Sequence, residues 1–307
     1  MPERDEYMPG LMPERDGYIP GVPCWVDASE PDPEAAVGFY SGLFGWEFED
    51  VMPPGSEGKY FMARIRGLDV AAVGSVLDAA PQWAMWNTYI WVDSADETAS
   101  KIRDAGGSVV IEPYDVTDAG RMAMFADPEG ATFCVLQANQ HKGARIVNEP
   151  GSLNLNGLNT RDVDGAKSFY GSVFGWRTLA LDGGPEMWTL SGFGDFLERD
   201  NPDLRKQMAE ADAPEGFEDV VGTITLIADD QPDTPAHWSV IFAVDDADSA
   251  AAKATELGGK VIVPPFDAPW VHMTVIGDPQ GATFIASKFV PENKDLGSGT
   301  DAAVGAG

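Results

Sequence analysis

Hydrophobic and polar positions follow the same order four times along the chain. In the first unit, the apolar segment VPCWVD (residues 22–27) has the character of a short strand. Ala36, Phe39, Tyr40 and Leu43 then recur at helical spacing, and strand-like segments follow around residues 46–48, 60–65 and 70–76. The pattern predicts a module made of one strand, one helix and three strands.

Local signals define the ends of the first predicted helix. Asp32 is suited to the N-cap and Pro33 to the first helical turn, whereas Gly45 is suited to the C-terminal cap. The second module repeats the order, with a strand at 87–92, a helix at 95–105 and strands at 108–111, 121–125 and 131–137. Modules three and four occupy about residues 153–228 and 237–289, and module three contains an acidic insertion at 197–220.

The modules are related in pairs, because the sequence of the first half recurs, in similar form, in the second half. DPEAAVGFYSGLFGW begins at Asp32, and DVDGAKSFYGSVFGW begins at Asp162. The later segments MWNTYIWVDSAD and DPEGATF also return, as HWSVIFAVDDAD and DPQGATF. A doubled unit places equivalent residues at equivalent positions in each copy. We therefore expect an α+β protein of two similar domains, with helices outside curved mixed sheets.

These boundaries give a domain at residues 18–142 and a second at 150–290. Residues 1–17 are expected to form a tail, and the small polar residues 291–307 a disordered one. Residues 1–22 are themselves an 11-residue tandem duplication, whose second copy opens with Met12. The sequence leaves open whether Met1 or Met12 is the true start.

Composition excludes several classes of function. The net charge of −30 disfavours nucleic acid and anionic membranes as partners, and no apolar run approaches the ~18 residues of a membrane span. The N-terminus lacks the pattern of a signal peptide, which favours the cytoplasm. Cys24 and Cys134 cannot make a disulfide framework, and we expect both to be small buried residues.

The phrases FYSGLFGWEF and FYGSVFGW, together with the turns at Asp127 and Asp278, resemble the vicinal oxygen chelate superfamily. This superfamily includes glyoxalase I, bleomycin-resistance proteins and extradiol dioxygenases. The resemblance covers about residues 20–290 and is strongest to tandem glyoxalase-like proteins of actinobacteria. It implies four βαβββ modules, paired into two glyoxalase-like domains whose curved sheets surround pockets.

The metal chemistry of the superfamily is not matched at the positions that the resemblance implies. Trp25 (or Cys24), Asn87 and Cys134 stand there in the first half, and Leu155, Ser239 and Ile285 in the second. These residues are not the usual His, Gln and Glu ligands of divalent first-row metals. We therefore expect no metal and no cofactor, although a histidine site assembled in space stays open.

His272 is the candidate catalytic residue. It lies in the strand-like segment WVHMTVIG, where alternation places either His272 or its neighbours inward. Facing a cavity, it could act as a general acid or base; otherwise it is a hydrogen-bonded histidine at the rim. Asp115 and Asp267 recur in EPYD and PPFD, which favours a role in turns.

The tryptophans and methionines of the predicted strands suit a flat aromatic ligand. The candidate ligand-binding residues, some of which ordinary core packing would also explain, are Trp25, Trp86, Trp91, Met122, Met124, Cys134, Trp188, Trp238, Trp270 and Met273. The acidic composition favours a ligand that carries an amine.

Two functions follow as hypotheses. The first is a metal-free protein that binds or sequesters an aromatic secondary metabolite of the polyketide class, as drug-binding, antibiotic-resistance members of the superfamily do. The second is an enzyme of antibiotic biosynthesis, similar to a hydroxylase, oxygenase, lyase or isomerase, acting on an aromatic polyketide or a ketoaldehyde. We expect a monomer, since the tandem fusion replaces a dimer of single units; a role as accessory to an oxygenase is the remaining possibility.

Overall fold

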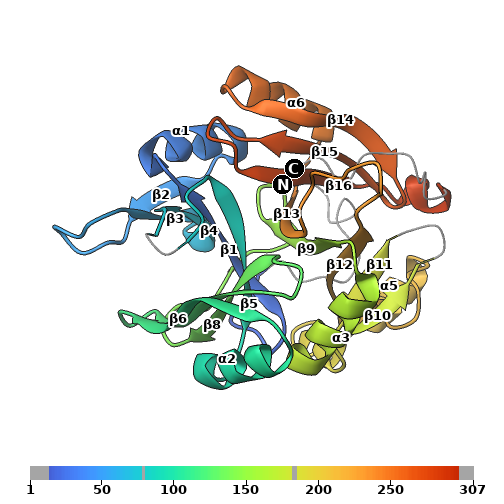
Figure 1. Ribbon diagram of the computed structural model, residues 1–307. Helices are drawn as coiled ribbons and strands as arrows, with labels where there is room; N and C mark the ends of the chain where they lie inside the picture. Colours follow the sequence, from blue (N-terminus) through green and yellow to red (C-terminus); the bar gives the residue numbers. More distant parts are fainter. Residues whose placement is uncertain (1–13, 78–79, 182–184, 297–307) are drawn as a thin grey trace.

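A computed structural model describes residues 14–77, 80–181 and 185–296 and shows two eight-stranded mixed sheets (Figure 1). The first half of the chain contributes β1 (Pro23–Glu30), α1 (Pro33–Phe44), β2 (Glu47–Asp50), β3 (Tyr60–Ile65), β4 (Leu68–Ser75), β5 (Met85–Trp91), α2 (Ala95–Asp104), β6 (Ser108–Val116), β7 (Gly120–Ala126) and β8 (Thr132–Ala138). Its strand order, β2-β3-β4-β1-β5-β8-β7-β6, joins two βαβββ modules edge to edge.

The second half repeats this plan with an addition. It consists of β9 (Leu153–Thr160), α3 (Val163–Phe174), β10 (Arg177–Ala180), β11 (Glu186–Thr189), β12 (Val220–Leu226), β13 (His237–Ala243), α6 (Ala247–Glu256), β14 (Lys260–Ala268), β15 (Val271–Gly277) and β16 (Thr283–Phe289). Between β11 and β12 the chain forms α4 (Phe193–Leu197), α5 (Leu204–Glu210) and the 3₁₀ helix η2 (Phe217–Asp219). The predicted acidic segment at 197–220 contains α5 and η2, and α4 lies largely before it; we call residues 190–219 together the insertion. The four modules and two domains predicted from the repeats are confirmed.

The helices begin and end where their caps require. Asp32 accepts a hydrogen bond from the Ala35 amide at the start of α1, and Gly45 ends the helix with φ of +70°, a conformation that favours glycine. Asp162 and Gly175 cap α3 in the same way. All four long helices lie on the outside of the sheets (Figure 1), so each sheet has a helix-covered face and an opposite, concave face.

The two halves contact each other through the repeated phrases. Tyr40 of α1 donates a 3.0 Å hydrogen bond to Asp278, in the turn before β16, and accepts one from Trp86. The second copy repeats this contact, since Tyr170 donates to Asp127 and accepts from Trp238. Each tyrosine therefore reaches the turn of the opposite half, and the main hydrophobic core contains residues from both halves.

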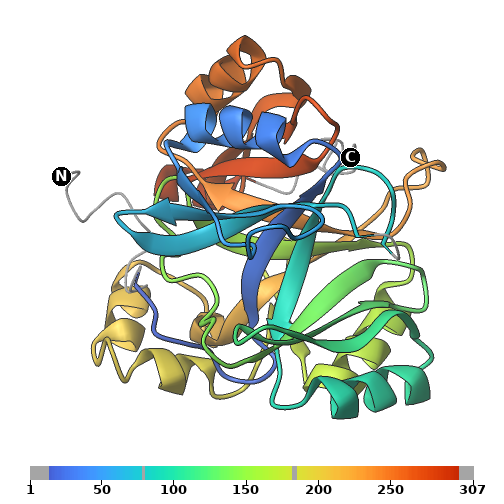
Figure 2. The ribbon, with the colours of Figure 1, turned by 90° about the vertical axis from the view of Figure 1, so that its left-hand side faces the viewer.

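The described ends of the chain are held against this body. Arg145 donates a hydrogen bond to the carbonyl of Arg15, and Glu14 forms a bridge with Ile146. Figure 2 shows the N-terminal segment beside the helices of the insertion. Residues 291–295, which composition places in a disordered tail, form a 3₁₀ helix, η3 (Pro291–Asp295), because Asn293 bonds to Asp267 and to the Val271 carbonyl. The rest of both expected tails, residues 1–13 and 297–307, lies outside the described ranges.

Candidate functional site

Strand register defines a row of side chains across the concave face of the first sheet. Trp25 of β1 pairs with Tyr89 of β5, which pairs with Cys134 of β8, which pairs with Met124 of β7. Paired residues on adjacent strands share a face, so these four side chains lie side by side. Asp27 and Asn87 form the next pair along β1 and β5 on the same face.

Asp27 is the centre of a buried polar cluster on this face. Its Oδ1 accepts a 2.8 Å hydrogen bond from Asn87, and its Oδ2 accepts bonds of 2.9 and 2.7 Å from the hydroxyls of Tyr60 and Tyr89. Trp25 donates in turn to the Tyr60 oxygen at 3.2 Å. Because three of these four bonds converge on the Asp27 carboxyl group and the fourth joins Trp25 to Tyr60, the cluster fixes five side chains from β1, β3 and β5.

Burial controls the ionisation of the cluster. Burial raises the pKa of Asp27. The three hydrogen bonds favour the charged form and act to lower the pKa, but the effect of burial is larger. Burial, reinforced by Asp27, also raises the pKa of Tyr60 and Tyr89, so both stay neutral donors. Neither Asp27 nor the tyrosines were singled out from the sequence. The available signal was one carboxylate within the apolar segment VPCWVDA.

A histidine from the connection between the halves lies against this cluster. The ring of His141 meets Trp25 edge-on, with 4.4 Å between ring centroids. Burial lowers the pKa of His141 to about 4, against the opposing effect of Asp69. His141 is therefore neutral at pH 7 and packs as an aromatic ring rather than as a cation.

The concave face of the second sheet has the opposite character. The equivalent row joins Leu155, Ile241, Ile285, Val275 and Val263. Val263, Val275 and Ile285 form a hydrophobic cluster of their own, separate from the main core. Around it, Leu155, Ile241, Phe266 and Met273 are only partly buried. We call these seven residues the apolar concave face.

Comparison with known proteins agrees with this architecture. The family model described as Glyoxalase/Bleomycin resistance protein/Dioxygenase superfamily matches residues 25–135 and again residues 150–285. The chain belongs to this superfamily. The resemblance drawn from the FY phrases and the DPxG turns is thereby confirmed.

Relatives within the superfamily extend over most of the chain. "Putative glyoxylase CFP32" of Mycobacterium tuberculosis is 39% identical, over 95% of this chain and 100% of its own length. "Anthracycline biosynthesis protein DnrV" of Streptomyces peucetius is 34% identical, over 85% of this chain and 91% of its own.

Solved structures of the superfamily share the fold. The Mn(II)-bound glyoxalase from Novosphingobium aromaticivorans has a TM-score of 0.54 at 16% identity, and the alignment covers 88% of this chain and 83% of that one. The 2,3-dioxygenase LapB from Pseudomonas sp. KL28 has a TM-score of 0.55 at 12% identity, covering 87% and 92%.

The residues at the superfamily's ligand positions do not fit a metal ion. In the first sheet, Trp25 donates to Tyr60, Asn87 binds Asp27, and burial raises the pKa of the Cys134 thiol well above its ordinary value. In the second sheet the positions hold Leu155, Ser239 and Ile285. Among the described residues, no group of three or more His, Cys, Asp and Glu side chains is placed to hold a metal.

The structure divides the predicted ligand-binding residues among several places. Trp25, Met124 and Cys134 lie on the concave face of the first sheet, with Met122 further along β7, and Met273 belongs to the apolar concave face. Trp86 and Trp238 bond to Tyr40 and Tyr170 on the helix-covered faces, where Trp188 packs against Tyr170. Trp91 lies beside Tyr18, and Trp270 stacks on Phe289.

His272, the catalytic candidate, lies between two carboxylates. Its Nδ1 is 2.8 Å from Asp267 and its Nε2 is 3.0 Å from Asp248 of α6. Burial acts to lower its pKa, but the bonds to Asp267 and Asp248 outweigh that effect and raise it. The His272 ring therefore joins the helix α6 to β14 and β15.

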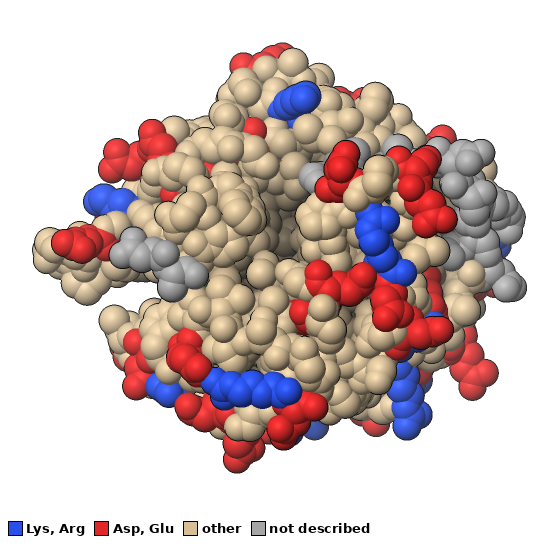
Figure 3. Space-filling view, in the orientation of Figure 1, with Lys and Arg blue, Asp and Glu red and all other residues tan. Residues whose placement is uncertain are grey.

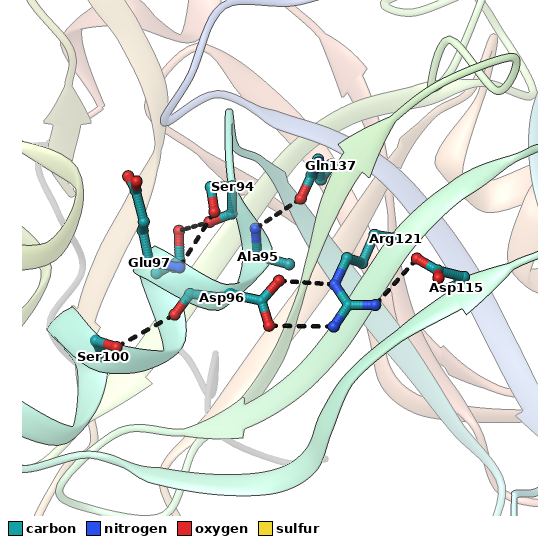
Figure 4. Close-up of polar contacts among 9 residues, drawn as sticks. Ser94, Ala95, Asp96, Glu97, Ser100, Asp115, Arg121 and Gln137 are labelled. Carbon is teal, nitrogen blue, oxygen red and sulfur yellow. Dashed lines mark hydrogen bonds and ion pairs between the residues drawn. The ribbon is translucent and has the colours of Figure 1, made fainter.

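The first half contains the counterpart of this arrangement. Arg121 donates to both carboxylate oxygens of Asp96 on α2 and to Asp115 on β6 (Figure 4). Asp96, Asp115 and Arg121 correspond to Asp248, Asp267 and His272 in the repeat. The structure thus places His272 in a helix-to-strand contact that both halves share, on the side of the sheet opposite Met273 and the apolar concave face.

Charge is distributed unevenly over the surface. On the face shown in Figure 3, acidic and basic side chains gather toward the periphery, while the centre carries few of them and is hollowed. Among the described residues, no helix has the length and apolar character needed to cross a membrane.

Proposed function

We propose that the chain binds a flat aromatic small molecule on the apolar concave face of the second sheet, without a metal ion. The observation that carries this proposal is the separate cluster of Val263, Val275 and Ile285, which is bordered by partly exposed Ile241, Phe266 and Met273. A partly exposed apolar surface on a concave sheet is a typical site for a small hydrophobic ligand.

The difference between the two halves supports this choice of face. In the first sheet the hydrogen-bonding groups of Asp27, Tyr60 and Asn87 already bind one another, and His141 packs against Trp25. A ligand there would have to break buried hydrogen bonds, each worth on the order of 1 kcal/mol or more. The second sheet presents aliphatic and thioether groups, which a ligand can cover without that loss.

The relatives indicate the class of ligand. Two of them, from Streptomyces peucetius and Streptomyces sp. strain C5, are named as anthracycline biosynthesis proteins. A fused aromatic ring system of this kind matches a surface of Ile, Val, Met and Phe side chains. The net charge of −30 favours the approach of a ligand that carries an ammonium group.

A charge placed on the apolar concave face tests the proposal. We expect Met273→Glu to weaken binding of an amino-sugar-bearing anthracycline at least about tenfold, because the carboxylate must be desolvated beneath the rings. Quenching of tryptophan fluorescence during titration measures the affinity.

The duplicated chain supplies the matched control for this variant. Met122 occupies the equivalent position on β7 of the first sheet and is also partly buried. Met122→Glu adds the same charge to the other half and should leave the affinity within about twofold of wild type. Equal losses in the two variants, or no saturable binding to the wild-type protein, would exclude the apolar concave face as the site.

An enzyme is the second candidate, and the buried Asp27 cluster is the observation in its favour. A carboxyl group of raised pKa beside two neutral tyrosines is able to transfer a proton. Chromatography together with mass analysis of the anthracycline recovered after the titration separates the two functions. Recovery of the same compound with unchanged mass and retention supports binding, whereas a changed mass or a new isomer indicates catalysis and points to Asp27.

A further inference from the structure

A cavity lies between the N-terminal segment, the insertion and the second sheet. Its volume is about 70 Å³. Leu153–Asn156 of β9 and Val220–Val221 of β12 form one side, and Phe193, Leu197 and Met208 of the insertion form another. Arg15 and Tyr18 of the N-terminal segment complete the wall. Figure 2 shows the backbone of this segment beside the insertion helices. The lining is mostly apolar, with a small number of polar groups.

Arg15 is the positive group of this lining. Its guanidinium carbon is 5.7 Å from the centroid of the Tyr18 ring and 5.5 Å from that of Phe193, so it is in cation–π contact with both rings. Within the described part of the chain, no carboxylate forms an ion pair with it. Although the protein has 50 acidic and 20 basic residues, this guanidinium is held away from carboxylates.

A second arginine of this region, Arg205, shows the contrast. Arg205 of α5 forms ion pairs with Asp195, Glu198 and Glu218. Glu218 also borders the cavity, but its charge is balanced by Arg205 at 2.8 Å. Asp200 adds a weaker attraction for Arg15 from beyond ion-pair distance. The charge of Arg15 therefore stays available to a ligand.

The amide groups of the lining are already oriented. Asn156 accepts a 2.8 Å hydrogen bond from Thr88 of the first sheet, and Asn154 donates one of 3.0 Å to Asn148. Fixed side chains of this kind, with a rigid β9 backbone behind them, keep the cavity open beside the guanidinium. The arrangement is that of a preformed small-molecule site: apolar walls, a few placed polar groups and one charge.

We propose that this cavity binds a short carboxylic acid of three or four carbons, with its carboxylate on Arg15. A guanidinium matches a carboxylate through two parallel hydrogen bonds. The volume equals that of two or three water molecules at ~30 Å³ each, which suits about six non-hydrogen atoms. The alkyl end of the acid would contact Leu153, Leu197 and Met208.

This site is distinct from the proposed aromatic site. Only Leu155 belongs to both; the other six residues of the apolar concave face do not line the cavity. The proposal therefore stands or fails independently of anthracycline binding. It also assigns a role to the insertion, which has no counterpart in the first half.

Isothermal titration of the full chain with butyrate and with butyramide tests the charge requirement directly. The two probes have the same size and shape, and only butyrate is an anion. We expect butyrate to bind with millimolar affinity and butyramide at least about tenfold more weakly. Equal affinities, or no saturable butyrate binding up to about 50 mM, would overturn the proposal.

Variants then identify the cation. Arg15→Gln should reduce the affinity for butyrate at least about tenfold, to the level of butyramide. Arg199→Gln is the matched control, because Arg199 also lies over an aromatic ring of the insertion, Phe196 at 5.5 Å, but is exposed and does not line the cavity. Butyrate affinity that survives in Arg15→Gln, or that falls equally in Arg199→Gln, would refute the assignment. The comparison of the two probes on wild type remains decisive if Arg15→Gln does not fold.

Discussion

At the scale of single residues, Glu30 is the most unusual position. Its side chain is fully buried at the end of β1, and neither carboxyl oxygen has a hydrogen-bond partner in the described structure. Burial, and after it the neighbouring Asp278, raises its pKa to about 10. In the repeat, Thr160 takes the place of Glu30 and donates a hydrogen bond to Glu129. The first half thus keeps a protonated acid where the second half has a hydroxyl.

Stability should therefore depend on pH through Glu30. Because its pKa is higher in the folded chain than its ordinary 4.5, the folded state holds the proton more tightly, and stability falls as pH rises from about 4.5 toward 10. Glu30→Gln removes this loss and should raise the free energy of unfolding by up to about 5 kcal/mol at pH 8, with little change at pH 4.5. Urea unfolding at both pH values measures the difference. A gain of equal size at both would show that Glu30 ionisation does not matter.

Among single residues, the sequence identified some side chains and missed others for a definite reason. Cys134 and Asn87 were identified through the resemblance to the superfamily, whose ligand positions they occupy, and strand register places both on the concave face. Asp27 could not be identified as a site residue from the sequence, because its role depends on hydrogen bonds from Tyr60 and Tyr89, which lie on other strands. His272 could be assigned to a strand, but which side of that strand it occupies depends on Asp248 of a helix 24 residues away.

At the scale of elements, each of α1 and α3 is tied to a turn in the opposite half. Tyr40 connects α1 to the turn at Asp278, and Tyr170 connects α3 to the turn at Asp127. The indole groups of Trp86 and Trp238 bond to the same two hydroxyls. The helix phrase and the turn phrase, which appear as separate motifs in the sequence, are thus two sides of one contact.

Removing one hydroxyl tests the importance of this contact. Tyr40→Phe should lower the free energy of unfolding by about 1–3 kcal/mol, since it leaves Oδ2 of Asp278 and the indole N–H of Trp86 without their buried partner. Tyr170→Phe should have a similar effect for the same reason. Chemical denaturation measures both, with Tyr114→Phe as the control, because Tyr114 is 37% exposed and should change stability by less than about 0.5 kcal/mol. Comparable changes in all three variants would contradict the proposed role.

At the scale of the whole molecule, one hydrophobic core joins the two repeats. Phe44 and Trp46 of the first half pack against Phe242 of the second, with ring centroids 5.1 and 5.5 Å apart. Trp46 also donates to the Gly151 carbonyl, and Trp176 reciprocally to that of Gly21. The two sequence repeats therefore share one hydrophobic core.

Calorimetry should consequently show a single unfolding transition. Because the core crosses between the halves, neither can unfold while the other stays native, and the ratio of calorimetric to van't Hoff enthalpy should be about one. Two resolved transitions, one for each repeat, would mean that the shared core contributes little to the stability of either half.

The local architecture of the molecule could be predicted from the sequence, but the contacts between distant segments could not. Repeats and alternation gave the four modules, their order and the outward position of the helices, because these depend on local spacing. The crossed pairing of α1 with the turn at Asp278 did not follow, since nothing local in either phrase specifies its partner. The same limit applies to the cavity at Arg15, which unites segments about 190 residues apart.

The two equivalent contacts between the halves, at Glu129 and at Gln280, differ in chemistry, and this difference determines which halves are able to pair. In the chain, Glu129 meets Thr160, while Gln280 bonds to the backbone of Asp32 near Glu30. If two first halves paired with each other in the same geometry, Glu129 would face Glu30, and two carboxyl groups would compete for one dry space. Such a pair is disfavoured, whereas the union of first and second halves is not. Divergence of the two repeats therefore favours pairing of a first half with a second half over pairing of two first halves.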